Sequence, residues 1–371
     1  AAGLILRSVH RYIPRFCEQV DSIPAIFPDY TNITLPQNMA PLNFRLMEKA
    51  KKHVVVFIDA QDNRFIFKTR NGGIRIPAGK WKKILHRSAN KSFKVEIFSK
   101  NNSNKWFRYK PFENRVVIDK IDKYIVYRQI NTGYILWEKM GIYQRCLENF
   151  KTYPVLTNEL TNQNCMNCHT FCKADPGKMV MHLRRPPSGT LLFTNDQIKF
   201  INTGTKYTMS QGVYPSWHPD GKIIAFSVNI IKQNFHASGN ENIYVFDKAS
   251  DIILYDIDKN MITTCPAIST KRLENFPVWS PDGNYLYYIS GPEYKKERPD
   301  SAVKYDLLRI AYNTSDGTWG QPDTLLTARE TGKSITYPDP SPDGKFLVFS
   351  IGDFGYFNAY SRSSDIYIMN L

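Results

Sequence analysis

One sequence frame, an aromatic residue and a proline followed by a Pro-Asp-Gly turn, occurs three times in the second half of the chain and constrains the fold most. The copies span residues 214–227, 276–288 and 337–350, and the aspartates of successive turns are 62 and 61 residues apart. Each turn leads into an alternating apolar strand, as a hairpin requires. This period suits a four-stranded blade with a long loop. The sequence therefore predicts a β-propeller over residues 188–371.

The rest of the chain divides into three predicted parts. Residues 1–46 are Pro-rich and aperiodic, which predicts an extended N-terminal arm. Residues 47–130 alternate apolar runs with polar turns, which predicts a β-sandwich interrupted by one short helix at 77–85. Residues 131–187 form a connecting region. With 22 Tyr, 22 Phe and 6 Trp among 22 Pro and 20 Gly, the expected fold class is mainly β.

The predicted propeller has few marked repeats. Propellers are built from at least four blades, whereas the chain offers three copies of the frame and a strand-rich stretch at 189–201. We therefore expect an incomplete propeller here. Either further blades are missing from this chain, or a second polypeptide completes the ring.

The connecting region contains the run Cys165-Met166-Asn167-Cys168-His169. Two thiols at this spacing can add to the vinyl groups of haem, and the adjacent His169 then becomes an axial iron ligand. The run predicts one covalently attached haem c. Two alternatives stay open: a zinc site completed by Cys172 and His182, and a disulfide between Cys165 and Cys168.

The repeats resemble the TolB-like, Trp-Asp-type propeller repeat over roughly residues 188–371. Together with the haem motif, several upstream runs resemble a bacterial family of TolB-like propeller proteins in which a C-x-x-C-H motif precedes the blades. Membership would imply export, often as a lipoprotein, and no defined role. The runs that carry this resemblance are Tyr127-Arg128, Gly133-Tyr134, Trp137, Met140 to Arg145 and Asn164 to His169.

The second axial ligand is expected shortly after the motif. The resemblance includes a Met-x-x-His-x-Arg pattern that implies His182 as the first candidate, with Met179 as the second. A tyrosine ligand or an open iron site is the alternative. Arg184 and Arg185 are candidates for pairing with the haem propionates.

Charge and cysteine content suggest the surroundings. A net charge of +15 should attract anionic partners, such as an acidic redox protein, an envelope complex or an anionic membrane face. Nucleic acid is not expected, because the basic residues are scattered and no known nucleic-acid motif occurs. Four further cysteines, an even number, suit disulfides in an oxidising compartment, and haem c is attached outside the cytoplasm. These are Cys17, Cys146, Cys172 and Cys265.

The expected function is that of an exported c-type haem protein, periplasmic or outer-membrane-associated, for electron transfer or redox sensing. The propeller would dock the partner. One alternative is a cell-envelope scaffold for proteins or glycans with a structural haem. Another is a haem enzyme with an open coordination site, although no catalytic triad, phosphate loop or paired carboxylates stand out. A binding or electron-transfer protein is preferred over an enzyme.

Overall fold

The computed structural model divides the chain into two compact units. Unit 1 comprises residues 1–127 and 143–155, and unit 2 comprises residues 128–142 and 156–371. The structure describes residues 13–130, 139–186, 188–195, 197–235, 243–358 and 361–371. Gly133, Tyr134 and Trp137, which contribute to the family resemblance, lie outside these residues.

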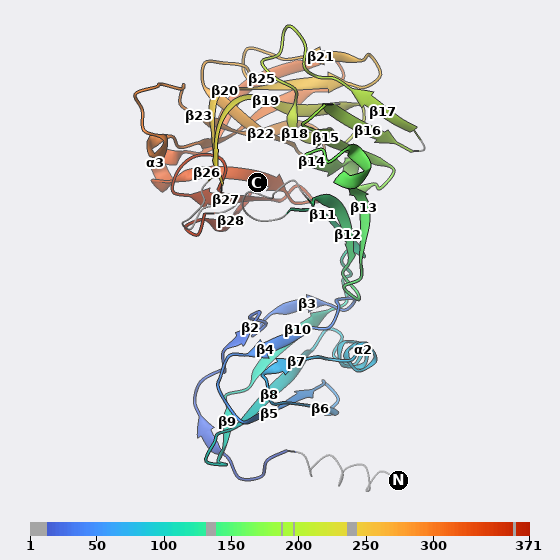
Figure 1. The fold of residues 1–371 in the computed structure, drawn as a ribbon, viewed down its shortest axis with the longest axis vertical. Coiled ribbons are helices and arrows are strands. Elements are labelled where there is room, and N and C mark those ends of the chain that lie inside the picture. Colours follow the sequence, from blue (N-terminus) through green and yellow to red (C-terminus); the bar gives the residue numbers. More distant parts are fainter. Residues whose placement is uncertain (1–12, 131–138, 187, 196, 236–242, 359–360) are drawn as a thin grey trace. The chain divides into compact units, whose positions relative to one another are not determined.

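The chain passes between the units three times, along three strands that pair with one another. These strands are β11 (Tyr124–Gln129), β12 (Gly141–Cys146) and β13 (Thr152–Thr157), in that order in their sheet (Figure 1). The boundary between the units falls within each of them.

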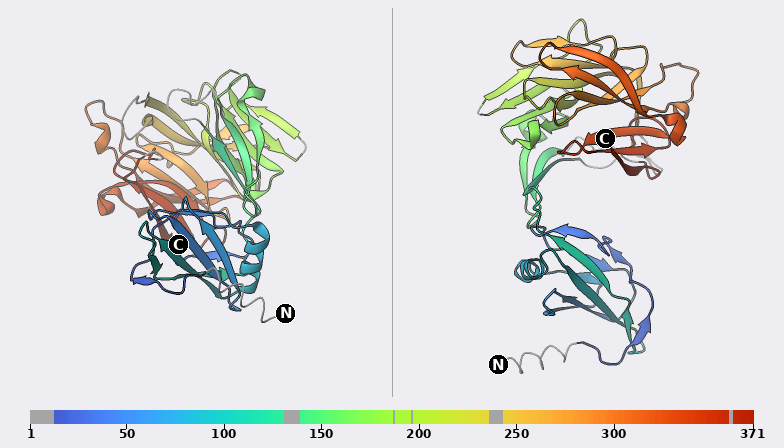
Figure 2. Two further views of the ribbon diagram at one scale, coloured as in Figure 1. Left: turned by 60° about the horizontal axis from the view of Figure 1, so that its bottom comes forward. Right: turned by 180° about the vertical axis from the view of Figure 1, so that it is seen from behind.

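Unit 1 consists of a large sheet covered on one side by a small sheet and a helix (Figure 2). The predicted arm contributes strands to both sheets. The large sheet contains β1 (Glu18–Val20), β3 (Thr34–Pro36), β5 (Lys52–Ile58), β6 (Arg64–Thr69), β8 (Ser92–Lys100), β9 (Trp106–Tyr109) and β10 (Phe112–Val117). The small sheet contains β2 (Ile26–Phe27), β4 (Phe44–Leu46) and β7 (Gly73–Ile74).

The predicted short helix is present as α2 (Ala78–Arg87). Pro77 stands at its N-cap, where the missing amide proton costs nothing. Trp81, Ile84 and Leu85 recur at helical spacing and are buried in the same core as the inner side of the small sheet. The helix and the small sheet therefore form one layer over the large sheet.

Unit 2 contains four successive β-sheet blades among its described residues, which run from β14 to β28 in Figure 1. Their innermost strands β14, β18, β22 and β26 contact one another in succession. Blade 1 consists of β14 (Met166–Phe171), β15 (Lys178–Leu183), β16 (Gly189–Thr194) and β17 (Gln197–Ile201). Blade 2 consists of β18 (Val213–Trp217), β19 (Ile223–Phe235), β20 (Ile243–Asp256) and β21 (Met261–Thr263). Blade 3 consists of β22 (Leu273–Trp279), β23 (Tyr285–Gly291), β24 (Asp306–Asn313) and β25 (Thr318–Leu326). Blade 4 consists of β26 (Ser334–Pro340), β27 (Phe346–Gly352) and β28 (Asp365–Asn370).

Short helical turns connect some of these strands. They are η2 (Asn158–Thr161), η3 (Cys172–Ala174), η4 (Asp300–Ala302) and α3 (Ala328–Thr331). The prediction of a mainly β chain that contains a propeller is confirmed. Over the described residues, no helix has both the length and the apolar character needed to cross a bilayer.

Each innermost strand has a bulge at the same place. The bulged residue has a left-handed backbone, with φ of 48° at Cys168, 49° at Tyr214, 50° at Phe276 and 51° at Tyr337. Positive φ is unfavourable for residues with a Cβ. The three rings offset this cost by packing together, with centroids 4.4 Å apart for Tyr214 and Phe276 and 4.5 Å apart for Phe276 and Tyr337.

In blades 2 and 3, the turn that follows the bulge packs against the corresponding turn of the blade before it in the chain. His218 Nε2 lies 3.1 Å from the carbonyl oxygen of Gly283, at hydrogen-bond distance. The His218 ring also packs on Trp279, with centroids 4.7 Å apart. In the same way Cys172 Sγ donates to the carbonyl of His218 at 3.8 Å. The Pro-Asp-Gly turns therefore join neighbouring blades as well as neighbouring strands.

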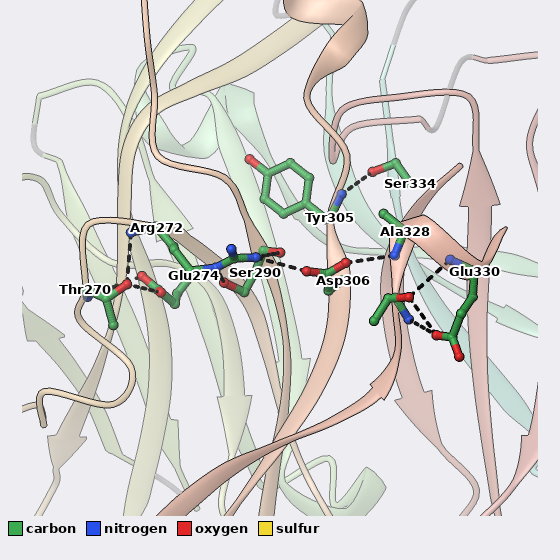
Figure 3. A network of polar contacts seen from close by, with 10 residues as sticks. Thr270, Arg272, Glu274, Ser290, Tyr305, Asp306, Ala328, Glu330 and Ser334 are labelled. Atoms are coloured by element: carbon green, nitrogen blue, oxygen red, sulfur yellow. Dashed lines mark hydrogen bonds and ion pairs between the residues drawn. The ribbon is translucent and has the colours of Figure 1, made fainter. Parts of the chain in front are cut away.

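A chain of polar contacts connects strands of blade 3 with the segment that enters blade 4 (Figure 3). Arg272 donates through Nε to Ser290 Oγ at 2.8 Å and through Nη2 to Asp306 Oδ2 at 2.9 Å. The other oxygen of Asp306 accepts the amide of Ala328 at 2.7 Å. Asp306 thus fixes the start of α3, where Glu330 completes a capping box.

Replacing Gly283 by alanine tests the contact between turns. Gly283 has φ of 79°, and an added Cβ would lie against His218 Nε2 and 3.0 Å from Pro219 Cγ. Gly332→Ala is the matched control, since Gly332 has φ of 69° and open space around it. We expect about 1 kcal/mol of destabilisation from backbone strain in the control and about 1–3 kcal/mol more at Gly283 from the steric contact. Calorimetric unfolding of unit 2 measures both, and equal losses would contradict the proposed contact.

Candidate functional site

A cavity of unit 2 with a volume of about 860 Å³ lies beside the innermost strands. Its wall combines thiols, imidazoles, guanidinium groups, amides and aromatic rings. The lining side chains that matter for its chemistry are Arg128, Cys165, Asn167, Cys168, His169, His182, Arg184, Gln211, Tyr214, Asn229, Gln233, Tyr337 and Tyr356. A cavity of this size suits a sizeable organic molecule.

The bulge in β14 brings both cysteines of the motif to this cavity. Residues three apart on a regular strand point to opposite faces. Cys165 precedes the strand, and the extra residue at Cys168 shifts the pairing between Asn167 and His169, which re-aims a side chain. Burial raises the pKa of the Cys168 thiol, partly offset by Arg184 and by a hydrogen bond from the Tyr214 amide.

The two imidazoles of the predicted iron site both line the cavity. His169 follows the bulge, and its ring meets Phe171 edge-on at 6.4 Å. His182 is buried on β15, opposite Asn167, with Nδ1 3.4 Å from Thr190 Oγ1. Burial, helped by Arg184, lowers the pKa of His182 to about 4. His182 is therefore neutral at pH 7 and keeps a nitrogen lone pair.

The cavity wall is cationic. Arg128 and Arg184 both line it, and none of the described residues lining it is Asp or Glu. Arg128 donates to the Asn167 side chain and to the Met166 carbonyl at 3.5 Å. Arg184 is held through its amide, which donates to the Cys165 carbonyl at 3.0 Å. These positions favour a ligand that carries carboxylates.

The remaining predicted site residues lie elsewhere. Met179 is buried on β15 but does not line the cavity, and neither does Arg185, whose amide donates to Asn164 Oδ1 at 2.9 Å. Cys172 lies in the core between blades 1 and 2, near Trp217. All six cysteines carry unpaired thiols, so neither the Cys165–Cys168 disulfide nor a pairing among the other four is present.

A buried carboxylate that the sequence did not predict lies behind the cavity. Asp247 accepts from Asn229 Nδ2 at 2.9 Å, from Asn275 Nδ2 at 2.8 Å and from the Tyr305 hydroxyl at 3.3 Å. Burial raises its pKa to about 6, although these hydrogen bonds lower it. Asn229 lines the cavity, and its Oδ1 is buried without a partner. That oxygen can accept a hydrogen bond from a ligand.

Comparisons with known proteins return matches only among solved structures. No protein-family model matches the chain, and no curated protein matches it. A putative 6-phosphogluconolactonase from Bacteroides uniformis is 11% identical at a TM-score of 0.36, covering 86% of this chain and 99% of its own. An oligogalacturonate lyase in complex with manganese is 11% identical at a TM-score of 0.35, covering 95% of this chain and 97% of its own. These similarities concern architecture alone. The TolB-like family therefore stays a prediction.

The predicted electron-transfer or redox-sensing function is wrong. Among the residues that the structure describes, no group of three or more His, Cys, Asp or Glu side chains is placed to hold a metal ion. The two alternative functions, the cell-envelope scaffold and the haem enzyme, are wrong on the same ground. The zinc site through Cys172 and His182 is likewise not formed. Attachment of haem c and export are separate predictions and stay so.

Asp247 predicts a pH dependence of stability. A folded pKa of about 6 against 3.8 for an ordinary aspartate stabilises the fold below pH 3.8, and this contribution is lost as the pH rises through 6. The loss should amount to about 3 kcal/mol at most. We expect Asp247→Asn to remove this slope and the exposed Asp258→Asn to keep it. Denaturant unfolding of unit 2 from pH 4 to 7 measures the difference, and parallel curves for all three proteins would contradict the assignment.

Proposed function

We propose that unit 2 functions by binding a carboxylate-bearing organic molecule in the cavity beside its innermost strands. The proposal rests on one observation: two arginines line the cavity, and none of the described residues that line it is acidic. Guanidinium groups hold carboxylates through two parallel hydrogen bonds. The molecule would have an extensive apolar surface, because aromatic and aliphatic side chains form much of the remaining wall.

The binding groups are held in place before a ligand arrives. Arg128 is hydrogen-bonded to β14, and Arg184 directly follows β15. These two strands pair with each other. Tyr214 and Tyr337 are positioned by their bulges and by the rings of neighbouring blades. Preorganisation of this kind reduces the entropy lost on binding.

Metal-free protoporphyrin IX, a planar dicarboxylate, is a suitable probe because it separates recognition of the acid groups from iron chemistry. We expect saturable quenching of its fluorescence by the full chain. Arg184→Gln should weaken binding about tenfold or more, since it removes a charge-assisted hydrogen bond. Arg185→Gln is the matched control, because Arg185 does not line the cavity, and it should leave the affinity unchanged. Equal affinities of the two variants would overturn the proposal.

Haem c remains our proposal for a resident cofactor, with no electron-transfer or sensing role attached. Cys165, Cys168 and His169 line the same cavity, which supports the fit of their side chains to a thiol-attached haem. His182, neutral at pH 7, supplies a second nitrogen in that wall. The group would bring a planar ring with two carboxylates for Arg128 and Arg184. Export to the periplasm or outer membrane also stays a prediction.

Covalent attachment is tested by expressing the chain with a haem-maturation system and extracting it under denaturing conditions. We expect haem to stay with the protein, and the Cys165→Ser, Cys168→Ser double variant to lose it. Cys265→Ser, at a thiol that does not line the cavity, is the control that should retain it. If all haem is extracted while protoporphyrin still binds, the cofactor proposal fails and the binding function stands.

A further inference from the structure

The net positive charge of the protein belongs entirely to unit 1. Residues 1–127 and 143–155 contain 26 Lys and Arg against 11 Asp and Glu, a net charge of +15. Unit 2 contains 23 of each kind and is neutral. Steering of anionic partners is therefore a property of unit 1 alone.

Part of this charge is displayed on the layer formed by the small sheet and α2. Both elements bury their apolar sides in one core, so their other sides face outward together. Arg45 on β4 is exposed and pairs with Phe27 on β2 and with Gly73 on β7. On α2, residues Lys80, Lys82, Lys83 and His86 are exposed, and the helix contains no acidic residue. We call this exposed side the basic layer.

The basic layer combines uncompensated charge with exposed apolar side chains. Within the part of the chain that the structure describes, no ion pair joins Arg45, Lys82 or Lys83 to a carboxylate. Phe27, opposite Arg45 in the small sheet, is 69% exposed. Met47, which directly follows β4, is 58% exposed. Exposed bulky apolar residues next to cations are suited to the boundary between lipid headgroups and acyl chains.

We propose that unit 1 docks on an anionic lipid surface through the basic layer. Three of its cations are the lysines Lys80, Lys82 and Lys83, and lysine is depleted from protein–protein interfaces. A lipid surface also needs no matching contour, since it responds to summed charge within a Debye length and to a few inserted side chains. Phe27 and Met47 enter the headgroup region, and Arg45 with the α2 lysines contacts lipid phosphates.

Vesicle flotation of the full chain tests this docking. The probes are two kinds of vesicle, one of phosphatidylcholine alone and one that also contains about 30% of the anionic lipid phosphatidylglycerol. Each is tested at low and at high salt. We expect binding to the anionic vesicles only, and its loss at high salt. The triple variant Arg45→Glu, Lys82→Glu, Lys83→Glu should partition about 100-fold more weakly or worse, given the contribution of each basic residue at such a surface.

A charge-matched control separates the basic layer from net charge. Lys199→Glu, Lys295→Glu, Lys296→Glu alters three exposed lysines of unit 2 by the same total charge and should keep vesicle binding. Phe27→Ala should weaken binding several-fold without changing the melting temperature, because Phe27 is exposed. Equal losses in the two triple variants would overturn the proposal. So would retention on immobilised polyglutamate without vesicle binding, which would indicate an acidic protein partner instead.

Discussion

The architecture of unit 2 depends on one local constraint, a left-handed residue at the bulge of each innermost strand. Cys168, Tyr214, Phe276 and Tyr337 share this backbone within a few degrees of φ. Each such residue costs about 1–2 kcal/mol of backbone energy, so the conformation persists only where packing offsets it. Ring packing does so at the three aromatic positions. The aromatic residue of each repeated aromatic-Pro dipeptide therefore holds the innermost strands of successive blades together beside the cavity.

In blade 1 the cysteine motif takes the place of the aromatic-Pro dipeptide. Cys168 occupies the position of the aromatic residue, and His169 that of the proline that follows it in the other blades. The turn after β14 is also a variant, since Asp175 Oδ1 accepts the Gly177 amide at 2.9 Å much as Asp220 Oδ1 accepts the Lys222 amide at 2.8 Å. The thiols and imidazoles thus reach the cavity by the same backbone geometry that places tyrosines there.

This equivalence explains what the sequence could and could not predict. Blades 2 to 4 were predictable because the aromatic, the proline and the Pro-Asp-Gly turn are local features with fixed spacing. Blade 1 was not recognised as a repeat, because Cys168-His169 replaces the aromatic and the proline, and Asp-Pro-Gly replaces the turn. Cys165, Cys168, His169 and His182 were named from a local motif, and all four line one cavity. Asp247 was not foreseen, since its burial arises from contacts with Asn275 and Tyr305, outside its own blade. Pairings between distant segments leave no local sequence pattern.

The net charge of the whole chain also hid how charge is distributed between the two units. A value of +15 for the chain averages a strongly basic unit with a neutral one, and the boundary falls inside three paired strands that sequence periodicity does not reveal. The neutral unit still selects anions, because field strength in a cavity depends on the few groups that line it and on the low dielectric around them. Arg128 and Arg184 act there at short range, whereas the lysines of unit 1 act through solvent and are screened by salt. Raising the ionic strength should therefore separate the two proposed activities, weakening lipid docking far more than binding in the cavity.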